Sequence, residues 1–256
     1  EAMGKFTVPT AFETRNTGSD TVSATRGIGA ARNWILKKFD DFSVAAQNRL
    51  VTSHFYFDVN ICGVGRHKNV VAVLPGMDTI NKEIIILEGH FDSRCESACD
   101  TACVAHGMED NGSGTALVLE LARVMSNYSF PQTLVFMATT GEEQGLVGAS
   151  QFAQYLQDNG VRAEGVLNND VIGGVICGQT ASPPGCPGPN NIDSTQVRLF
   201  SRGGVNSINK CLARFVKLQY QEEVLPTAAV PMQISLMSAE DRTGRGGDHM
   251  PFRARG

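Results

Sequence analysis

The sequence contains no apolar run close to the roughly 18 residues that a membrane-spanning helix requires, and no secretory leader is visible at Glu1. It also lacks a basic cluster: 22 lysines and arginines are scattered among 26 acidic residues, giving a net charge of -4. No internal repeat is present. We therefore expect neither a membrane span nor a nucleic acid partner, because binding a polyanion requires a basic surface.

The length and apolar content are those of a chain that can bury a full hydrophobic core. The 256 residues are 42% hydrophobic, which favours one large α/β domain over two small ones. The chain begins without an initiator methionine, as expected of a mature or trimmed form.

Seven cysteines are many for a cytosolic domain of this size. Cys177 and Cys186 bracket a loop of Gly, Pro, Ser and Thr that a disulfide would hold, so we expect these two to be bonded and the protein to be secreted or periplasmic. Cys95, Cys99 and Cys103 recur every four residues, a spacing that fits known metal clusters poorly, and we expect packed thiols there. An odd total leaves at least one free thiol.

Periodicity predicts strands that alternate with helices, which is typical of a three-layer α/β/α sandwich around a largely parallel mixed sheet. The expected strands are 49–60, 69–74, 83–88, 133–138 and 164–168. The expected helices are 112–128 and 147–157. Further elements at 194–200, 211–220 and 232–237 would complete the domain.

Polar residues stand where the apolar strands end. His90 follows the Ile-rich strand, Glu142 and Glu143 follow the next, and Asp170 follows the third, while Asp110 begins the turn into a helix. Each alone has a simpler explanation, such as a core histidine, a helix N-cap or a solvated acidic face. Open α/β sheets bind ligands at the carboxyl ends of their strands, however, so the recurrence predicts one metal site.

The residue types suit a site with two cations, roughly 3.5 to 4 Å apart, that share one carboxylate and leave a position for water. Asp110 suits the bridge, His90 and Asp170 would complete the first metal, and Glu143 belongs to the second. Neighbouring side chains point in opposite directions in an extended or turn backbone, so Glu142 and Glu143 cannot easily both bind one ion, and one of them remains free as a base. Asp92 can accept the other imidazole N–H of His90 and fix its tautomer.

With these motifs in place, the chain resembles the M28 family of zinc aminopeptidases. The matching segments are Gly89-His90-Phe91-Asp92-Ser93, Asp110-Asn111-Gly112-Ser113-Gly114, Gly141-Glu142-Glu143-Gln144-Gly145-Leu146, Asn169-Asp170 and Gly247-Asp248-His249-Met250-Pro251-Phe252. The resemblance implies two zinc ions, Glu142 as general base, release of N-terminal residues from peptide substrates, and secretion. It also implies a cis peptide bond between Asp110 and Asn111.

One departure concerns the last metal ligand, which in the family is a histidine beyond the Asp-His-x-Pro-Phe stretch. No such segment follows here, and among the histidines only His249 comes after Asp170. By family position Asp248 and His249 neighbour the active site. We expect that residues 1–256 are a single zinc-peptidase catalytic domain lacking its C-terminal portion, and that the second zinc binds weakly. The alternative is that His249 takes the place of the missing histidine ligand.

Related activities remain as alternatives. Glutaminyl cyclases share the fold and much of the pattern but use one zinc and do not hydrolyse peptides, and carboxypeptidase-type relatives exist. A binding module on a catalytically dead peptidase fold is a third alternative. The retained Glu142 and the two-metal form of the Asp110-Asn111-Gly112 segment favour the peptide hydrolase.

Overall fold

The structure is a computed structural model that describes residues 12–78, 80–81, 83–177 and 188–255. It divides into two compact units, residues 1–170 with 247–256, and residues 171–246, which we describe separately. The single catalytic domain expected from the sequence remains a prediction.

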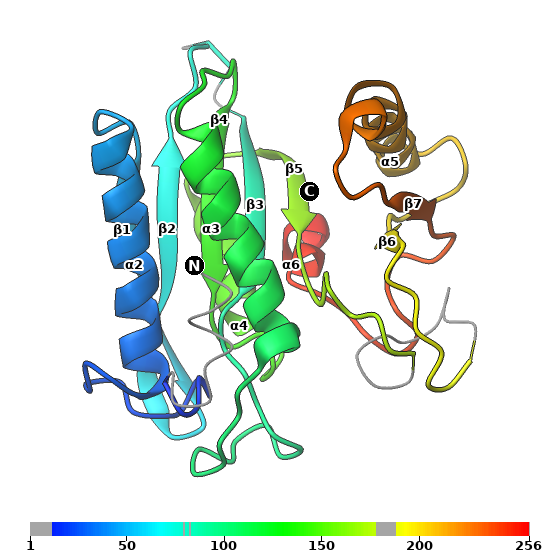
Figure 1. The fold of residues 1–256 in the computed structure, drawn as a ribbon. Helices are drawn as coiled ribbons and strands as arrows, with labels where there is room; N and C mark the ends of the chain where they lie inside the picture. The colour runs from blue at the N-terminus through cyan, green and yellow to red at the C-terminus, as the bar shows by residue number, and fades with distance from the viewer. Residues whose placement is uncertain (1–11, 79, 82, 178–187, 256) are drawn as a thin grey trace. The chain divides into compact units, whose positions relative to one another are not determined.

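The first unit is built on a five-stranded mixed sheet with the order β1-β2-β4-β3-β5 (Figure 1). Strand β2 runs antiparallel to both its neighbours, β1 and β4, whereas β3 runs parallel to β4 and to β5. The α/β class with a central mixed sheet, predicted from the sequence, is confirmed. The strand bounds are β1 Val51–Ile61, β2 Val64–Leu74, β3 Ile84–His90, β4 Thr133–Thr139 and β5 Ala163–Asn168.

Helices cover both faces of this sheet. Helices α2 (Gly27–Ala45) and α3 (Gly114–Met125) lie on one face, where Ile35, Phe39 and Leu119 are buried against strand residues (Figure 1). Helices α4 (Val147–Asp158) and α6 (His249–Ala254) cover the other face, with Phe152 and Phe252 in a second apolar cluster. Two cores separated by one sheet give the three layers that the sequence predicts.

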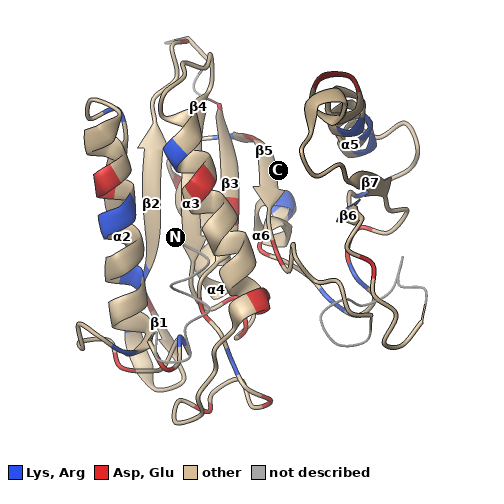
Figure 2. Ribbon diagram, in the orientation of Figure 1, with Lys and Arg blue, Asp and Glu red and all other residues tan. Residues whose placement is uncertain are grey.

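The outer faces of α2 and α3 carry both signs of charge (Figure 2). Lys37 pairs with Asp41 one turn along α2, and Arg123 pairs with Glu120 on α3. Such exposed pairs contribute little to stability, so the apolar stripes facing the sheet determine where the helices pack. Among the described residues, no helix combines the length and the apolar character needed to cross a membrane.

The second unit contains a parallel two-stranded sheet, β6 (Gln196–Leu199) with β7 (Gln233–Leu236), and the helix α5 (Ile208–Gln219). Two short helical turns, Tyr220–Val224 and Leu225–Thr227, follow α5. The sequence predicted elements in these regions but assigned them to the same three-layer domain. In the structure β6 and β7 pair with each other and do not extend the five-stranded sheet.

Candidate metal centre

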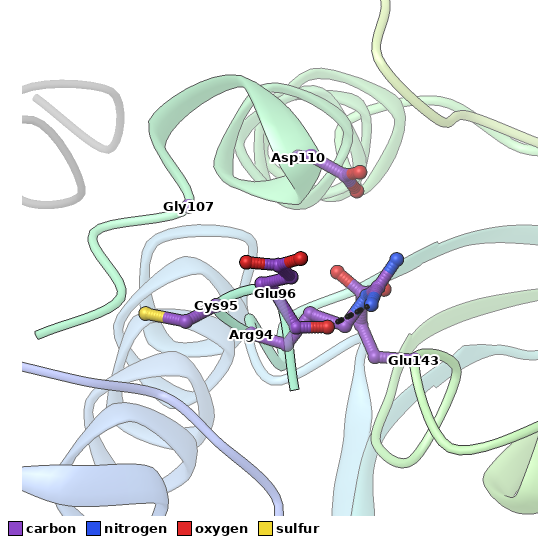
Figure 3. Close-up of a pocket in the computed structure, with 6 residues that line it drawn as sticks. All are labelled: Arg94, Cys95, Glu96, Gly107, Asp110 and Glu143. Atoms are coloured by element: carbon purple, nitrogen blue, oxygen red, sulfur yellow. Dashed lines mark hydrogen bonds and ion pairs between the residues drawn. The ribbon is translucent and has the colours of Figure 1, made fainter. Parts of the chain in front are cut away.

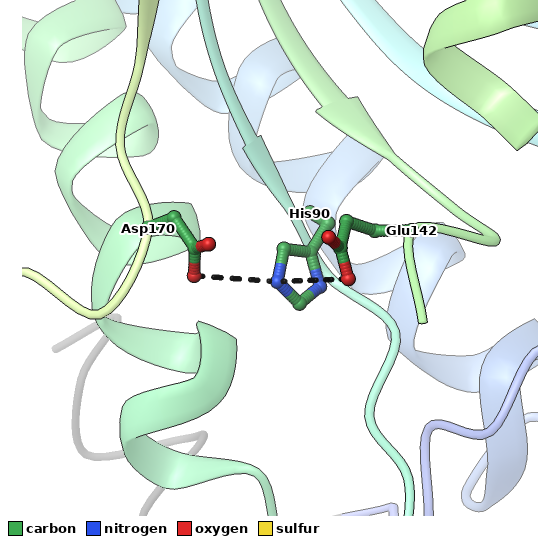
Figure 4. Close-up of side chains that lie close together, drawn as sticks. All are labelled: His90, Glu142 and Asp170. Atoms are coloured by element: carbon green, nitrogen blue, oxygen red, sulfur yellow. Dashed lines mark ion pairs between the residues drawn. The ribbon is translucent and has the colours of Figure 1, made fainter. Parts of the chain in front are cut away.

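His90 is the centre of an acidic cluster at the carboxyl end of β3. Its side chain is 1% exposed, and its Nε2 atom lies 3.2 Å from Asp110 Oδ1, 3.5 Å from Asp170 Oδ1 and 3.8 Å from Glu142 Oε2. Figure 4 shows the imidazole between the carboxylates of Asp170 and Glu142. Ligand atoms of His90, Glu142 and Asp170 all lie within 4.8 Å of one another.

The parallel strands bring these side chains together. His90 is the last residue of β3, Glu142 lies in the turn after β4, and Asp170 comes two residues after the end of β5. Because β4, β3 and β5 are consecutive and parallel, their carboxyl ends lie at one edge of the sheet. Sequence reasoning could therefore predict the convergence from the strand order alone.

The turn that carries Asp110 packs tightly against the end of β5. The peptide bond between Asp110 and Asn111 is cis, as the family resemblance implied. The side chain of Asn111 donates to Asn169 O at 2.8 Å and accepts from the backbone N–H of Gly114 at 2.9 Å. A Cβ at Gly114 would lie only 1.9 Å from Asn169 O, so this position requires glycine.

Asp92 is fully buried and holds the loops after β3 and β4 together. Its carboxylate accepts hydrogen bonds from the backbone N–H groups of Glu142 and Glu143, both at 3.3 Å, and from the Thr17 hydroxyl at 3.2 Å. Nδ1 of His90 lies 3.6 Å from Asp92 Oδ1 and 3.2 Å from its backbone oxygen. These contacts orient the imidazole so that Nε2 faces the acidic cluster.

Glu143 lies on one wall of a cavity of about 320 Å³ (Figure 3). Its Oε2 accepts a hydrogen bond from Arg94 Nε at 2.6 Å. The lining residues are Arg94, Cys95, Glu96, Gly107, Asp110 and Glu143. The cavity thus joins Asp110 of the cluster to Glu143, the other carboxylate that the sequence analysis assigned to a metal.

The cysteines near the site form disulfides. Cys95 is bonded to Cys103 and Cys99 to Cys62, so the expectation of packed thiols in this loop is wrong. Cys62 lies at the β1–β2 turn, far from the loop in sequence, and periodicity cannot reveal such a partner. Cys211 is free, which agrees with the odd total. Cys177 is disulfide-bonded, but Cys186, its expected partner, lies outside the described residues.

The cluster attracts positive charge. Burial alone lowers the pKa of His90, but the carboxylates of Asp110, Asp170 and Asp92 together raise it well above its usual value. Burial, with repulsion from neighbouring carboxylates, raises the pKa of Glu142 to about 9. Burial and repulsion from Asp110 raise the pKa of Glu143 to about 7, against the opposing effect of its Arg94 hydrogen bond. The site therefore favours a bound cation.

Asp248 and Glu88 are further buried carboxylates on this side of the sheet. Asp248 is 1% exposed and accepts a hydrogen bond from the Thr139 hydroxyl at the end of β4. Glu88, two residues before His90, is fully buried, and neither of its carboxylate oxygens makes a hydrogen bond with the described residues. Burial, followed by repulsion from Asp248, raises the pKa of Glu88 well above its usual value.

Sequence reasoning missed Glu88, although an acidic residue at the end of the Ile-rich run was the available signal. The described group of mutually close ligand atoms includes neither Asp248 nor His249. His249 is the first residue of α6 and is half-buried.

The donor set fits zinc. Imidazole nitrogen and carboxylate oxygen are ligands that zinc accepts, usually three or four together. The buried Nε2 of His90 makes no well-aligned hydrogen bond with the described residues, although three carboxylates lie within 3.8 Å of it. A cation among these groups would satisfy all of them. Fold and cluster together define an α/β protein with a candidate metal centre at the carboxyl end of its sheet.

Comparison with known proteins agrees with this class. Residues 69–175 match the model of Peptidase family M28, and a probable zinc metalloprotease of Pyricularia oryzae is 35% identical over 256 residues. That alignment covers 94% of this chain and 49% of the fungal protein; the chain spans about half the length of the curated relatives it matches. By this match, residues 69–175 belong to peptidase family M28.

Solved structures share the fold. The Legionella pneumophila LapA aminopeptidase aligns with a TM-score of 0.68 and 20% identity, covering 99% of this chain and 57% of that one. A glutaminyl cyclase from an Acidobacteriales bacterium aligns with a TM-score of 0.61 and 18% identity, covering 100% of this chain and 74% of that one. At such identities the likeness concerns the fold alone.

Proposed function

We propose that this protein is a zinc-dependent peptide hydrolase that releases N-terminal residues from peptides. The observation that carries the proposal is the convergence of Asp110, Asp170 and Glu142 on the buried Nε2 of His90. The match of residues 69–175 to a peptidase family and a curated relative named as a probable zinc metalloprotease support the reaction class. The aminopeptidase fold of LapA is compatible with the exopeptidase activity.

In this proposal His90, Asp110 and Asp170 would hold one zinc, and Asp110 and Glu143 would contribute to a second. When bound, zinc supplies Lewis acidity that polarises the scissile carbonyl and makes water a stronger acid. Asp92 keeps the imidazole of His90 oriented through the contacts described above. Arg94 holds Glu143 by a charge-assisted hydrogen bond, which fixes the direction of that carboxylate.

Glu142 is the proposed general base. Its side chain is 13% exposed and lies within the cluster, 3.8 Å from His90 Nε2, whereas the neighbouring Glu143 contacts Arg94. Its carboxylate would accept the proton of the attacking water and deliver it to the leaving amine. In the absence of a cation, burial raises the pKa of Glu142 to about 9 and favours the protonated form, so the base role requires the positive charge of bound zinc, which lowers the pKa of a neighbouring carboxyl group.

The disulfides support a location outside the cytosol. Cystines such as Cys62–Cys99 and Cys95–Cys103 form and persist in oxidising compartments. We therefore propose that the protein is secreted or periplasmic.

A single-zinc enzyme of the glutaminyl cyclase kind is the second candidate. The observation that favours it is the position of Glu143, whose carboxylate contacts Arg94 at 2.6 Å, while Glu142 lies in the ligand group around His90. Two zinc ions per chain would support the peptide hydrolase. One ion would fit both candidates, because the second zinc is expected to bind weakly in this chain, and the reaction product then separates them. A catalytically dead binding module would bind substrate peptides without turnover.

The test is a panel of aminoacyl chromogenic substrates and N-terminal glutaminyl peptides, assayed with zinc and after chelation. We expect zinc-dependent release of N-terminal residues that chelator abolishes and added zinc restores. Cyclisation of the glutaminyl peptides without hydrolysis would replace this proposal with the second candidate. Activity that survives complete zinc removal would contradict both.

A further inference from the structure

Arg15 is a buried arginine in the segment that precedes α2, and its side chain contacts the backbone on both sides of the candidate metal centre, next to His90 and before Asp110. It is 1% exposed. Its guanidinium donates three hydrogen bonds to backbone carbonyls: Nε to Phe91 O at 2.7 Å, Nη1 to His106 O at 2.5 Å and Nη2 to Gly107 O at 2.7 Å. One planar group thus contacts two chain segments that are distant from each other in sequence.

The two segments carry the proposed ligands. Phe91 lies between His90 and Asp92, and Gly107 precedes the turn that contains Asp110. The Gly107 carbonyl also accepts from the Gly112 N–H at 2.9 Å, so the same oxygen connects Arg15 to the far side of that turn. The guanidinium therefore links the backbone next to His90 to the backbone that leads into the turn of Asp110.

The backbone of Arg15 adds further contacts through Ser93. The Arg15 N–H donates to Ser93 Oγ at 3.1 Å, and the Ser93 N–H donates to Arg15 O at 3.2 Å. Ser93 Oγ in turn donates to Ala105 O at 2.8 Å. A Cβ at Gly107 would lie 2.4 Å from Ser93 Cβ and 2.8 Å from Arg15 Nη2, so the two segments pack closely against each other and against Arg15 at this position.

The chemistry requires arginine. A guanidinium offers five N–H donors in a fixed plane, whereas a lysine ammonium is a compact charge with three donors on a flexible stem. A lysine at this position cannot reach all three carbonyls with the same geometry. Asp92 and Asp110 both interact favourably with the charge of Arg15, which remains on the guanidinium because burial lowers its pKa only to about 10.

We propose that Arg15 is a positioning residue of the metal centre, holding the backbone that carries Asp110 at a fixed distance from the backbone that carries His90. The inference rests on the proposed metal site, and it extends that site to a segment about 75 residues before the first ligand. Its consequence is that zinc affinity depends on a residue that touches no zinc. Outer partners of metal ligands typically change affinity about 10- to 100-fold when they are replaced.

The test compares Arg15→Met and Arg15→Lys with a matched control, Arg32→Met. Arg32 is also a buried arginine, 7% exposed, but it lies on α2 and donates to Thr21 O at 2.8 Å, away from the centre. Zinc affinity is measured by competition with a chromophoric chelator, and thermal unfolding is followed for every variant. The absorption spectrum of the cobalt-loaded protein reports the ligand geometry.

We expect both Arg15 variants to bind zinc about 10- to 100-fold more weakly than wild type and to shift the cobalt bands, while the control keeps wild-type values. Wild-type zinc affinity in a folded Arg15 variant would overturn the inference, as would an equal loss in Arg32→Met. If neither Arg15 variant folds, Ser93→Ala decides, and unchanged zinc affinity in that variant overturns the inference. Failure of the wild type itself to bind zinc would instead refute the proposed function.

Discussion

Replacing Glu142 by glutamine tests the proposed division of labour between two adjacent carboxylates. Glutamine keeps the shape of the side chain and removes its basicity. The Glu142 backbone N–H would still donate to Asp92, and the contacts of His90 with Asp110 and Asp170 do not involve Glu142. Zinc content and substrate affinity should therefore survive.

The expected loss lies in turnover. A positioned general base contributes about 10²- to 10⁴-fold, so kcat should fall by this factor, equivalent to roughly 2.7 to 5.4 kcal/mol of activation free energy. Glu143→Gln should behave differently, because it weakens the charge-assisted contact with Arg94 and removes a proposed ligand charge. Its zinc affinity should fall by about 10-fold or more.

The assay measures zinc stoichiometry and kcat on the same preparations of wild type, Glu142→Gln and Glu143→Gln. Glu164→Gln, an exposed change on β5, is the control for loss of one carboxylate charge. If Glu142→Gln lost zinc and regained activity when zinc was added, the two roles would be reversed. Wild-type kcat in zinc-loaded Glu142→Gln would refute the base assignment.

Three further predictions concern stability. Gly114→Ala should destabilise the fold by about 1–3 kcal/mol or more, because the new Cβ would clash with Asn169 O. Gly165→Ala is the control and should not destabilise the fold, because a Cβ there meets nothing within 4 Å. Chemical denaturation measures both variants, and equal stabilities would refute the clash. Removing the disulfide Cys62–Cys99 should lower the free energy of unfolding by roughly 4 kcal/mol, and removing Cys95–Cys103 should lower it by roughly 2.5 kcal/mol, because the two disulfides close loops of 37 and 8 residues. A lower melting temperature after removal of Cys95–Cys103 than after removal of Cys62–Cys99 would contradict this. Burial lowers the pKa of His54 to about 4, below its value in the unfolded chain, so the folded protein should lose stability as the pH falls from about 6.5 towards 4. In His54→Gln the urea midpoint should change less over this pH range. A pH profile identical to that of wild type would contradict this.

The strands and helices around the site could be predicted because their patterns are local. The Ile-rich β3 and the apolar β4 are buried on both faces, and such strands read as continuous apolar runs. Once their order is known, the meeting of His90 with Asp170 follows from parallel topology. Helix α2 also has a regular apolar stripe at Ile28, Ile35 and Phe39, yet no helix was predicted there.

Contacts between distant segments could not be predicted. The bond from Cys62 to Cys99 and the hydrogen bonds from Arg15 to Phe91 join residues 37 and 76 positions apart, and no periodicity encodes such pairs. The contact of Arg94 with Glu143 likewise joins the loop after β3 to the turn after β4, 49 residues further along the chain. The residues that surround the cluster are for this reason harder to infer than the cluster itself.

The proposed function requires that zinc binds at His90. X-ray absorption or anomalous diffraction at the zinc edge on the zinc-loaded protein tests it most directly. We expect zinc about 2.0–2.2 Å from His90 Nε2 and from carboxylate oxygens of Asp110 and Asp170. Zinc bound elsewhere, with no nitrogen ligand from His90, would contradict it.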